Sequence, residues 1–197
     1  EIVEFLKSPE RFRQLGASNH SLTEREKDDY YATEPKAIDM LLTKERPAAK
    51  IWECACGEGH LSKRLIEKGY TVYSSDKVDR GYGEVRDFLT QRAMPADGCD
   101  ILTNPPYSVA LEFIKKALEL VGEENRVYML LRLNFLEGIR RRAELYEPNP
   151  PQKVCVFSKR ISCARGGDFK KYPQSAIAYA WFVWQKGYAG RTYIEWL

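Results

Sequence analysis

Histidine is scarce in this sequence, and long apolar runs are absent. Its 197 residues include only His20 and His60, and Cys54 and Cys56 lack a second ligand pair at zinc spacing, so we expect no metal site. No apolar stretch approaches the roughly 18–20 residues that span a bilayer, and no charged-then-apolar leader is visible. The sequence therefore predicts a cytoplasmic protein with reduced thiols and no membrane partner.

A strong net charge is also missing. The 31 Lys and Arg residues against 28 Asp and Glu residues give a formal charge of +3, far from the signature of a non-specific nucleic-acid binder. The balance is uneven, because ten basic and four acidic residues fall within 132–171. A solvated surface is the plain interpretation of this segment, and a phosphate-contacting face is the sharper one. The basic residues are Arg132, Arg140, Arg141, Arg142, Lys153, Lys159, Arg160, Arg165, Lys170 and Lys171.

The length and the 44% hydrophobic content fit one domain over residues 1–197, with 1–30 as a polar N-terminal appendage. A helix at 36–43 precedes a regular alternation of strands and helices, which predicts an α/β doubly wound fold with a mostly parallel sheet. The last strands follow one another without a helix, so we expect one antiparallel strand near the C-terminus. Expected strands are 50–55, 71–76, 99–103, 126–133, 153–157 and 175–185, with a short one at 193–197, and expected helices are 60–68, 110–121 and 135–146.

A glycine-containing turn, Glu53 to Gly59, follows the first of these strands. Ligands of doubly wound folds bind at the carboxyl ends of strands, where small residues let the backbone approach them. The third glycine of a dinucleotide fingerprint would fall at Ser62, which disfavours NAD. Asp76, at the end of the next strand, suits a ribose diol, and Asp87-Phe88 suits an adenine ring and its amino group. Turn, cap and core roles are the alternatives for these residues.

A second motif, Asn104-Pro105-Pro106-Tyr107, follows the strand expected at 99–103. Two prolines remove two N–H donors, so the motif presents two acceptors, the Asn104 side-chain oxygen and the Pro105 carbonyl. Together with the Tyr107 ring they suit a planar amino group on a π-system, because the acceptors take its two hydrogens and the ring stacks on the base. A structural turn is the alternative.

On these motifs the chain resembles S-adenosylmethionine-dependent amino methyltransferases, in particular the DNA adenine-N6 methyltransferases, including the small phage-type ones. The resemblance runs roughly from Tyr30 to Gly187 and implies a seven-stranded Rossmann-like sheet, the gamma order of motifs and catalysis by Asn104–Tyr107. The chain differs in having Cys54 where the family has Pro or Gly, and Glu34 inserted into a Thr-Pro pair. The implied cofactor-binding residues are Tyr31, Thr33, Glu53, Cys54, Ala55, Gly57, Gly59, Asp76, Asp87 and Phe88.

The resemblance implies transfer of a methyl group from S-adenosylmethionine to adenine N6 in DNA, with base flipping. Such a transfer relies on positioning and desolvation rather than on a metal or a histidine base. It also implies a phage or restriction-modification context. No room remains for a separate target-recognition domain, so we expect short or loose sequence specificity. Candidate substrate-binding residues from the basic segment are Arg141, Arg160, Phe169, Lys170 and Tyr172.

Other substrates and functions stay open. The same four-residue motif suits adenine in RNA and the glutamine amide of a protein, and the basic segment favours nucleic acid over protein. Cytosine-N4 methylation ranks lower, because such enzymes more often carry Ser in place of Asn104. A catalytically silent module that binds the cofactor is the non-enzyme alternative, and an NAD-linked oxidoreductase is the weakest.

Overall fold

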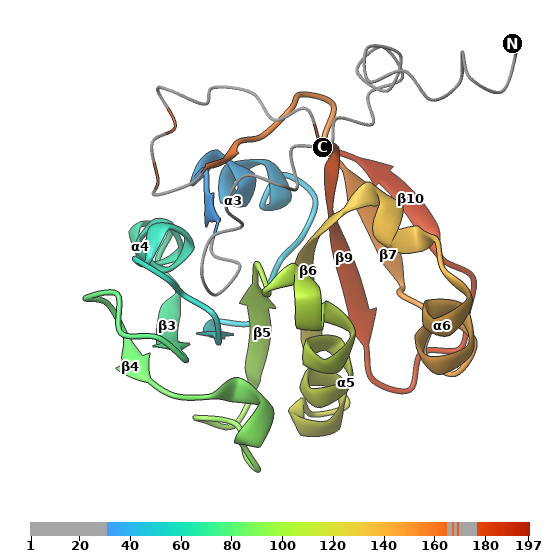
Figure 1. The fold of residues 1–197 in the computed structure, drawn as a ribbon, viewed down its shortest axis with the longest axis horizontal. Coiled ribbons are helices and arrows are strands. Elements are labelled where there is room, and N and C mark those ends of the chain that lie inside the picture. The colour runs from blue at the N-terminus through green and yellow to red at the C-terminus, as the bar shows by residue number, and fades with distance from the viewer. Residues whose placement is uncertain (1–30, 165–166, 168, 170–176) are drawn as a thin grey trace, which may run out of the picture.

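An eight-stranded sheet forms the centre of this computed structural model, which describes residues 31–164, 167, 169 and 177–197 (Figure 1). The strand order is β10-β7-β9-β6-β5-β2-β3-β4. Strand β9 runs antiparallel to both of its neighbours, and every other pair is parallel. The predicted α/β class and antiparallel strand are confirmed, and the short strand expected at 193–197 is β10, which pairs with β7. The strand beyond the seven expected is β4, which pairs with β3. The strands are β2 (Lys50–Glu53), β3 (Thr71–Asp76), β4 (Glu84–Val85), β5 (Cys99–Thr103), β6 (Arg126–Arg132), β7 (Lys153–Val156), β9 (Tyr179–Gln185) and β10 (Tyr193–Trp196).

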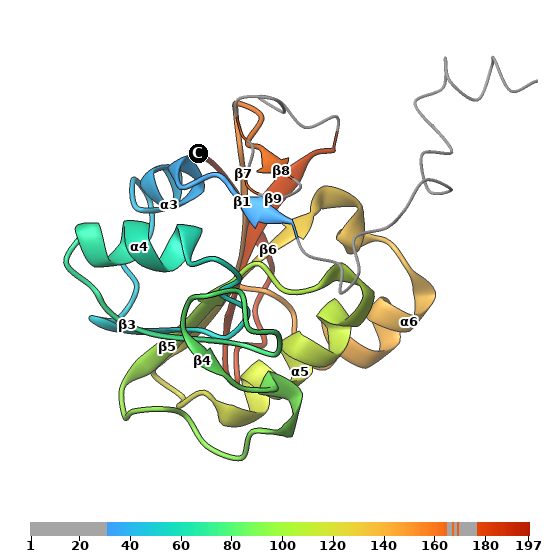
Figure 2. The ribbon, with the colours of Figure 1, turned by 60° about the vertical axis from the view of Figure 1, so that its left-hand side comes forward.

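Helices cover both faces of the sheet (Figure 2). Alternate residues of β6 point to opposite sides, as strand geometry requires: Val127 and Met129 join the core beneath α5, whereas Tyr128 and Leu130 join the core beneath α3 and α4. Both cores are fully buried, which explains why the central strands read as nearly continuous apolar runs. The helices are α3 (Lys36–Leu41), α4 (His60–Glu67) and α5 (Ala110–Leu120). The described residues contain no helix long and apolar enough to cross a membrane.

The helix expected at 135–146 is broken. A 3₁₀ turn, η4 (Leu133–Leu136), is followed by one turn of α-helix, α6 (Ile139–Arg141), and a π-helical turn, η5 (Arg142–Tyr146). Gly138 separates the first two with φ of 121°, a conformation that interrupts a helix and favours glycine. Phe135 packs edge-on against Phe182, with ring centroids 6.1 Å apart, and lies partly buried against the core beneath α5.

A small second sheet was not expected from the sequence. Strand β1 (Ala32–Thr33) pairs antiparallel with β8 (Cys163–Ala164), joining segments about 130 residues apart. Glu34 continues the contact, because its amide N–H donates to the Ser162 carbonyl at 2.9 Å and its carboxylate accepts the Ser162 N–H at 3.1 Å. The inserted Glu34 is therefore a structural tie that holds Thr33 in place.

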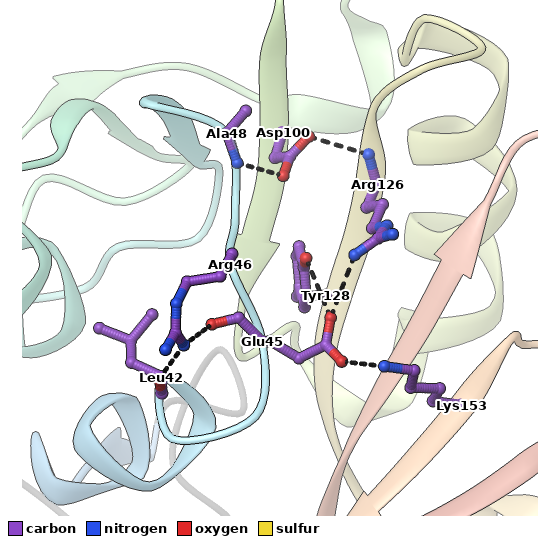
Figure 3. Close-up of polar contacts among 8 residues, drawn as sticks. All are labelled: Leu42, Glu45, Arg46, Ala48, Asp100, Arg126, Tyr128 and Lys153. Carbon is purple, nitrogen blue, oxygen red and sulfur yellow. Dashed lines mark hydrogen bonds and ion pairs between the residues drawn. The ribbon is translucent and has the colours of Figure 1, made fainter.

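The amino ends of the strands are fastened by a buried carboxylate, Glu45, which is 1% exposed (Figure 3). It pairs with Arg126 of β6 at 3.2 Å and Lys153 of β7 at 2.5 Å. Beside it, the Asp100 carboxylate accepts the backbone N–H groups of Ala48 and Arg126, at 2.8 and 2.9 Å. These contacts fix the relative positions of four elements and leave the opposite, carboxyl ends of the strands for a site.

Candidate functional site

A cavity of about 640 Å³ lies at the carboxyl ends of β2, β3, β5 and β6. This volume is typical of a small-molecule site, and the position is where doubly wound sheets bind ligands. The cavity brings together residues that lie in six separate parts of the sequence. Predicted residues that line it are Tyr31, Thr33, Glu53, Cys54, Ala55, Asp76, Asp87, Phe88, Asn104, Pro105, Pro106 and Tyr107.

Glu53, the last residue of β2, is 2% exposed yet lines the cavity. The Ser62 hydroxyl, from α4, donates a hydrogen bond to it. Burial raises the pKa of the Glu53 carboxyl to about 8, an effect that the Ser62 hydrogen bond opposes and the nearby Asp76 charge reinforces. Ser62 thus occupies the fingerprint's third glycine position and serves as a partner for Glu53.

Two further carboxylates come from the ends of β3 and β4. Asp76 accepts the Gly57 N–H at 2.8 Å and the Val78 N–H at 3.0 Å, one on each oxygen. Asp87 accepts the Leu89 N–H at 3.1 Å and pairs with Lys77 at 2.9 Å. Asp87 therefore serves as a helix cap, the alternative role noted for it, while still facing the cavity.

The two glycines of the turn shape the cavity without lining it. Gly57 has φ of 53° and presents its N–H to Asp76. Gly59 has φ of 79°, and a Cβ there would come within 2.3 Å of the Tyr82 ring. Both positions therefore require glycine, for conformation and, at Gly59, also for space.

The side-chain amide of Asn104 is held in one orientation. Its nitrogen donates to the Tyr31 carbonyl at 3.2 Å and to the Thr33 hydroxyl at 2.9 Å. Because a carbonyl can only accept, the group facing Tyr31 must be the NH₂. Asn104 Oδ1 is then buried on the other side, with no hydrogen-bond partner among the described residues. The site thus presents an unused acceptor at the cavity wall.

The Tyr107 ring, next to this acceptor, contacts two other side chains. It stacks on Tyr179, with ring centroids 6.0 Å apart, and the Arg132 guanidinium lies 4.7 Å from its centroid. Burial raises the pKa of the Tyr107 hydroxyl well above its usual range, so the ring stays neutral at physiological pH. Stacking of a base on this ring, which the motif predicts, stays a prediction, and in the structure as it stands Arg132 lies over the ring.

The residues expected to bind the substrate differ in their location and contacts. Arg141 lies over the Phe135 ring, 4.7 Å from its centroid, and faces a smaller cavity of about 260 Å³ that also contacts Tyr107. Arg160 is exposed, and Phe169 packs edge-on against His60 with ring centroids 5.4 Å apart. Lys170 and Tyr172 lie outside the described residues.

The basic segment carries less free charge than its composition suggests. Arg140 pairs with Glu112 and Glu144, at 3.1 and 2.8 Å, and Arg142 pairs with Glu147 at 2.8 Å. Lys153 forms an ion pair with the buried Glu45 at the amino ends of the strands, opposite the cavity. Among the described residues of the segment, these three cations are therefore paired within the chain, whereas Arg132 lines the main cavity.

Half of the residues of the cavity wall were not predicted, among them Arg132, His60 and Phe113. The others are Ala32, Cys56, Leu61, Lys77, Val78, Arg80, Leu89, Ser108 and Val109. A signal existed for Arg132, since a charged residue ends the otherwise buried apolar strand β6. His60 begins α4 directly after the glycine turn, and burial lowers its pKa, so it is neutral at pH 7. Phe113 resembles an ordinary core residue of α5, and only the fold places it beside Phe88, with ring centroids 4.9 Å apart.

Comparison with known proteins shows that the fold of this chain is similar to that of several solved structures. No protein-family model and no curated protein sequence matches the chain. A protein from Listeria monocytogenes described as a class I S-adenosylmethionine-dependent methyltransferase is 11% identical, with a TM-score of 0.56 over 97% of this chain and 74% of its own. A protein from Pyrococcus horikoshii described as an RNA methyltransferase is 16% identical, with a TM-score of 0.57 over 90% and 98%.

A dimethyladenosine transferase from Plasmodium falciparum is also similar, at 16% identity and a TM-score of 0.50 over 79% of this chain and 62% of its own. These identities are low, so what the three structures share with this chain is the arrangement of the sheet and its helices. The chain has the Rossmann-like fold of the class I S-adenosylmethionine-dependent methyltransferases.

Proposed function

We propose that the chain binds S-adenosylmethionine in the main cavity and transfers its methyl group to the N6 amine of adenine in DNA. The observation that carries the proposal is the oriented amide of Asn104, whose Oδ1 is buried at the cavity wall without a partner. A buried acceptor without a donor costs stability. An exocyclic amine of a ligand supplies the missing donor.

The acidic side of the cavity fits the cofactor. S-adenosylmethionine has an ammonium group, a ribose diol and an adenine amino group, all of which donate hydrogen bonds, and a positively charged sulfonium that supplies an activated methyl group. Glu53, Asp76 and Asp87 offer acceptors at three successive strand ends, and the Phe88 ring offers an apolar face.

On the substrate side, the residues act by orientation. The Pro105 carbonyl oxygen, next to Asn104 in the motif, is the second acceptor, and we assign to it the second hydrogen of the amine. Two acceptors fix the amine with its lone pair free to attack, and they stabilise the positive charge that develops on nitrogen. Buried apolar neighbours keep water out of this end of the cavity, and no side chain is required as a base before the methyl group is transferred.

Adenine in DNA is the favoured substrate because the resemblance on the four-residue motif points to it. The likeness to a dimethyladenosine transferase and to a protein described as an RNA methyltransferase supports an adenine or a nucleic acid at this site. The motif suits any planar amine, so RNA adenine and a protein glutamine amide are the outcomes against which DNA must be tested.

The test is methyl transfer from radiolabelled S-adenosylmethionine to duplex DNA, single-stranded DNA, RNA and protein in separate reactions. We expect label in DNA as N6-methyladenine. Label only in protein or only in RNA would overturn the proposed substrate. Asn104→Ala should abolish transfer while leaving S-adenosylhomocysteine affinity within about threefold, and Asn149→Ala, at an exposed asparagine outside the cavity, should behave as wild type.

A further inference from the structure

Arg132 is a cation at the substrate side of the main cavity that the proposed chemistry leaves unexplained. It ends β6, beside the strand that leads into Asn104. Within the described ranges no carboxylate forms an ion pair with it, whereas Lys77, the lysine of the same cavity, pairs with Asp87. Its Nε is buried without a hydrogen-bond acceptor. The guanidinium also has a side-chain hydrogen bond with Tyr179, so the donor that is left unused is Nε.

The positive charge of Arg132 does not assist the reaction of the target amine. Nitrogen gains positive charge as it accepts a methyl group, and a nearby guanidinium opposes that gain. Arg132 instead lies 4.7 Å from the centroid of the Tyr107 ring, the aromatic surface that a target base would use. A base that stacks there competes with the guanidinium for the ring. Tyr179 is fixed within β9, whereas the Arg132 side chain is long and flexible. Arg132 is therefore the neighbour of Tyr107 that can move away to make room for a base.

We propose that Arg132 is a substrate-binding residue that pairs with the phosphate flanking the target nucleotide when the base takes its place on Tyr107. The inference rests on the proposed function and makes it more specific, because it requires the substrate to have an anion next to the amino-bearing ring. A guanidinium suits this task for two reasons. Its N–H groups are spaced so that two of them can bind two oxygens of a phosphate, and its flat face can stack on an aromatic ring when no substrate is bound. A protein glutamine amide brings no such anion.

The test combines a variant of the protein with a variant of the DNA. Duplexes are made with a single neutral methylphosphonate at each position flanking the methylated adenine, and steady-state methylation is measured. For the wild type, one position should raise KM about tenfold or more, as expected for a lost charge-assisted hydrogen bond. Arg132→Gln should raise KM on unmodified DNA to a similar extent and should be insensitive to that methylphosphonate. The slope of log affinity against log salt should fall by about one.

Matched controls separate this role from a structural one. Arg142→Gln removes an equally basic residue that is paired with Glu147 outside the cavity, and it should retain the methylphosphonate effect. Arg132→Lys keeps the charge without the fork and should recover part of the affinity. S-adenosylhomocysteine affinity should stay within twofold for all three variants.

The outcomes distinguish the two proposals. A wild type that methylates no DNA overturns the proposed function and this role with it. A wild type that methylates DNA but shows no position-dependent methylphosphonate effect overturns the role of Arg132 alone, and that result needs no variant to fold. Equal sensitivity of wild type and Arg132→Gln would also overturn it, by placing the phosphate contact elsewhere.

Discussion

Replacing Glu53 by Gln should make the protein more stable at neutral and alkaline pH and less able to bind its cofactor. Glu53 is 2% exposed, and burial raises its pKa from an ordinary 4.5 to about 8. Glutamine has nearly the same shape, accepts the Ser62 hydroxyl and has no charge to bury. The substitution therefore isolates the cost of the ionised carboxylate.

The sign and size of the effect follow from the two pKa values. A carboxyl whose pKa is raised by folding contributes most to stability below pH 4.5 and loses that contribution as the pH rises to about 8. At 1.36 kcal/mol for each pH unit, the loss is about 3 kcal/mol at pH 7 and about 5 kcal/mol at pH 9. The glutamine amide brings two donors into the site, so these figures are upper limits for the stabilisation by Glu53→Gln.

Urea unfolding of both proteins at pH 5, 7 and 9 measures this directly. We expect nearly equal free energies of unfolding at pH 5 and a gap that widens with pH. Glu58→Gln, which removes a half-exposed carboxylate from the same loop, should leave the wild-type pH dependence in place. Parallel stability curves for wild type and Glu53→Gln would refute the argument that Glu53 is a strained, buried acid. Calorimetry with S-adenosylhomocysteine should show weaker binding to Glu53→Gln at pH 8, where the wild-type carboxylate is available for the ligand's ammonium.

Two further substitutions test the positioning of the amide and the fastening of the sheet. Thr33→Val removes the hydroxyl that accepts from Asn104 Nδ2 at 2.9 Å, and it should lower kcat about tenfold with little change in cofactor affinity; a normal kcat would show that Tyr31 alone orients the amide, and Thr33→Ser should restore activity. Glu45→Ala leaves two cations without their buried partner, and because those side chains are about one-third exposed, urea unfolding should show a loss of about 2–3 kcal/mol. The control Glu147→Ala breaks an exposed pair and should cost less than about 1 kcal/mol.

The central strands of the sheet were predictable because they are buried on both faces. β5 and β6 read as short apolar runs ending in polar residues, and each was placed within one residue of its observed bounds. The broken helix at 133–146 was not predicted, since Phe135, Leu145 and Tyr146 have the spacing of a helical face. Gly138 interrupts that face through its backbone conformation, which periodicity does not record.

Residues of the site were predictable where a short local motif contains them. They were not predictable where the site depends on contacts between segments that lie far apart in the sequence. Asn104 and Glu53 stand at strand ends in recognisable motifs, so their convergence on one cavity follows from the fold class. The pairing of β1 with β8, which brings Thr33 to Asn104, joins two-residue strands too short for any pattern. Arg132 was counted only as one of ten charges, because composition cannot distinguish a cation paired within the chain from one with no carboxylate partner.

The order of strands explains how one cavity can hold both a cation and an anion. β5, which leads into Asn104, lies between β2 and β6, so the carboxylates of β2 and β3 fall on one side of the amide and Arg132 falls on the other. A sulfonium cofactor is drawn toward the carboxylates, and a phosphate is drawn toward the guanidinium and repelled by the carboxylates. The methyl group in the proposed reaction then passes from the β2 side to the β6 side, with the amine held at the end of β5. Exchanging β2 and β6 in the sheet would bring Arg132 beside Asp76 and move Glu53 to the substrate side, so the strand order decides which ligand each of these charges faces.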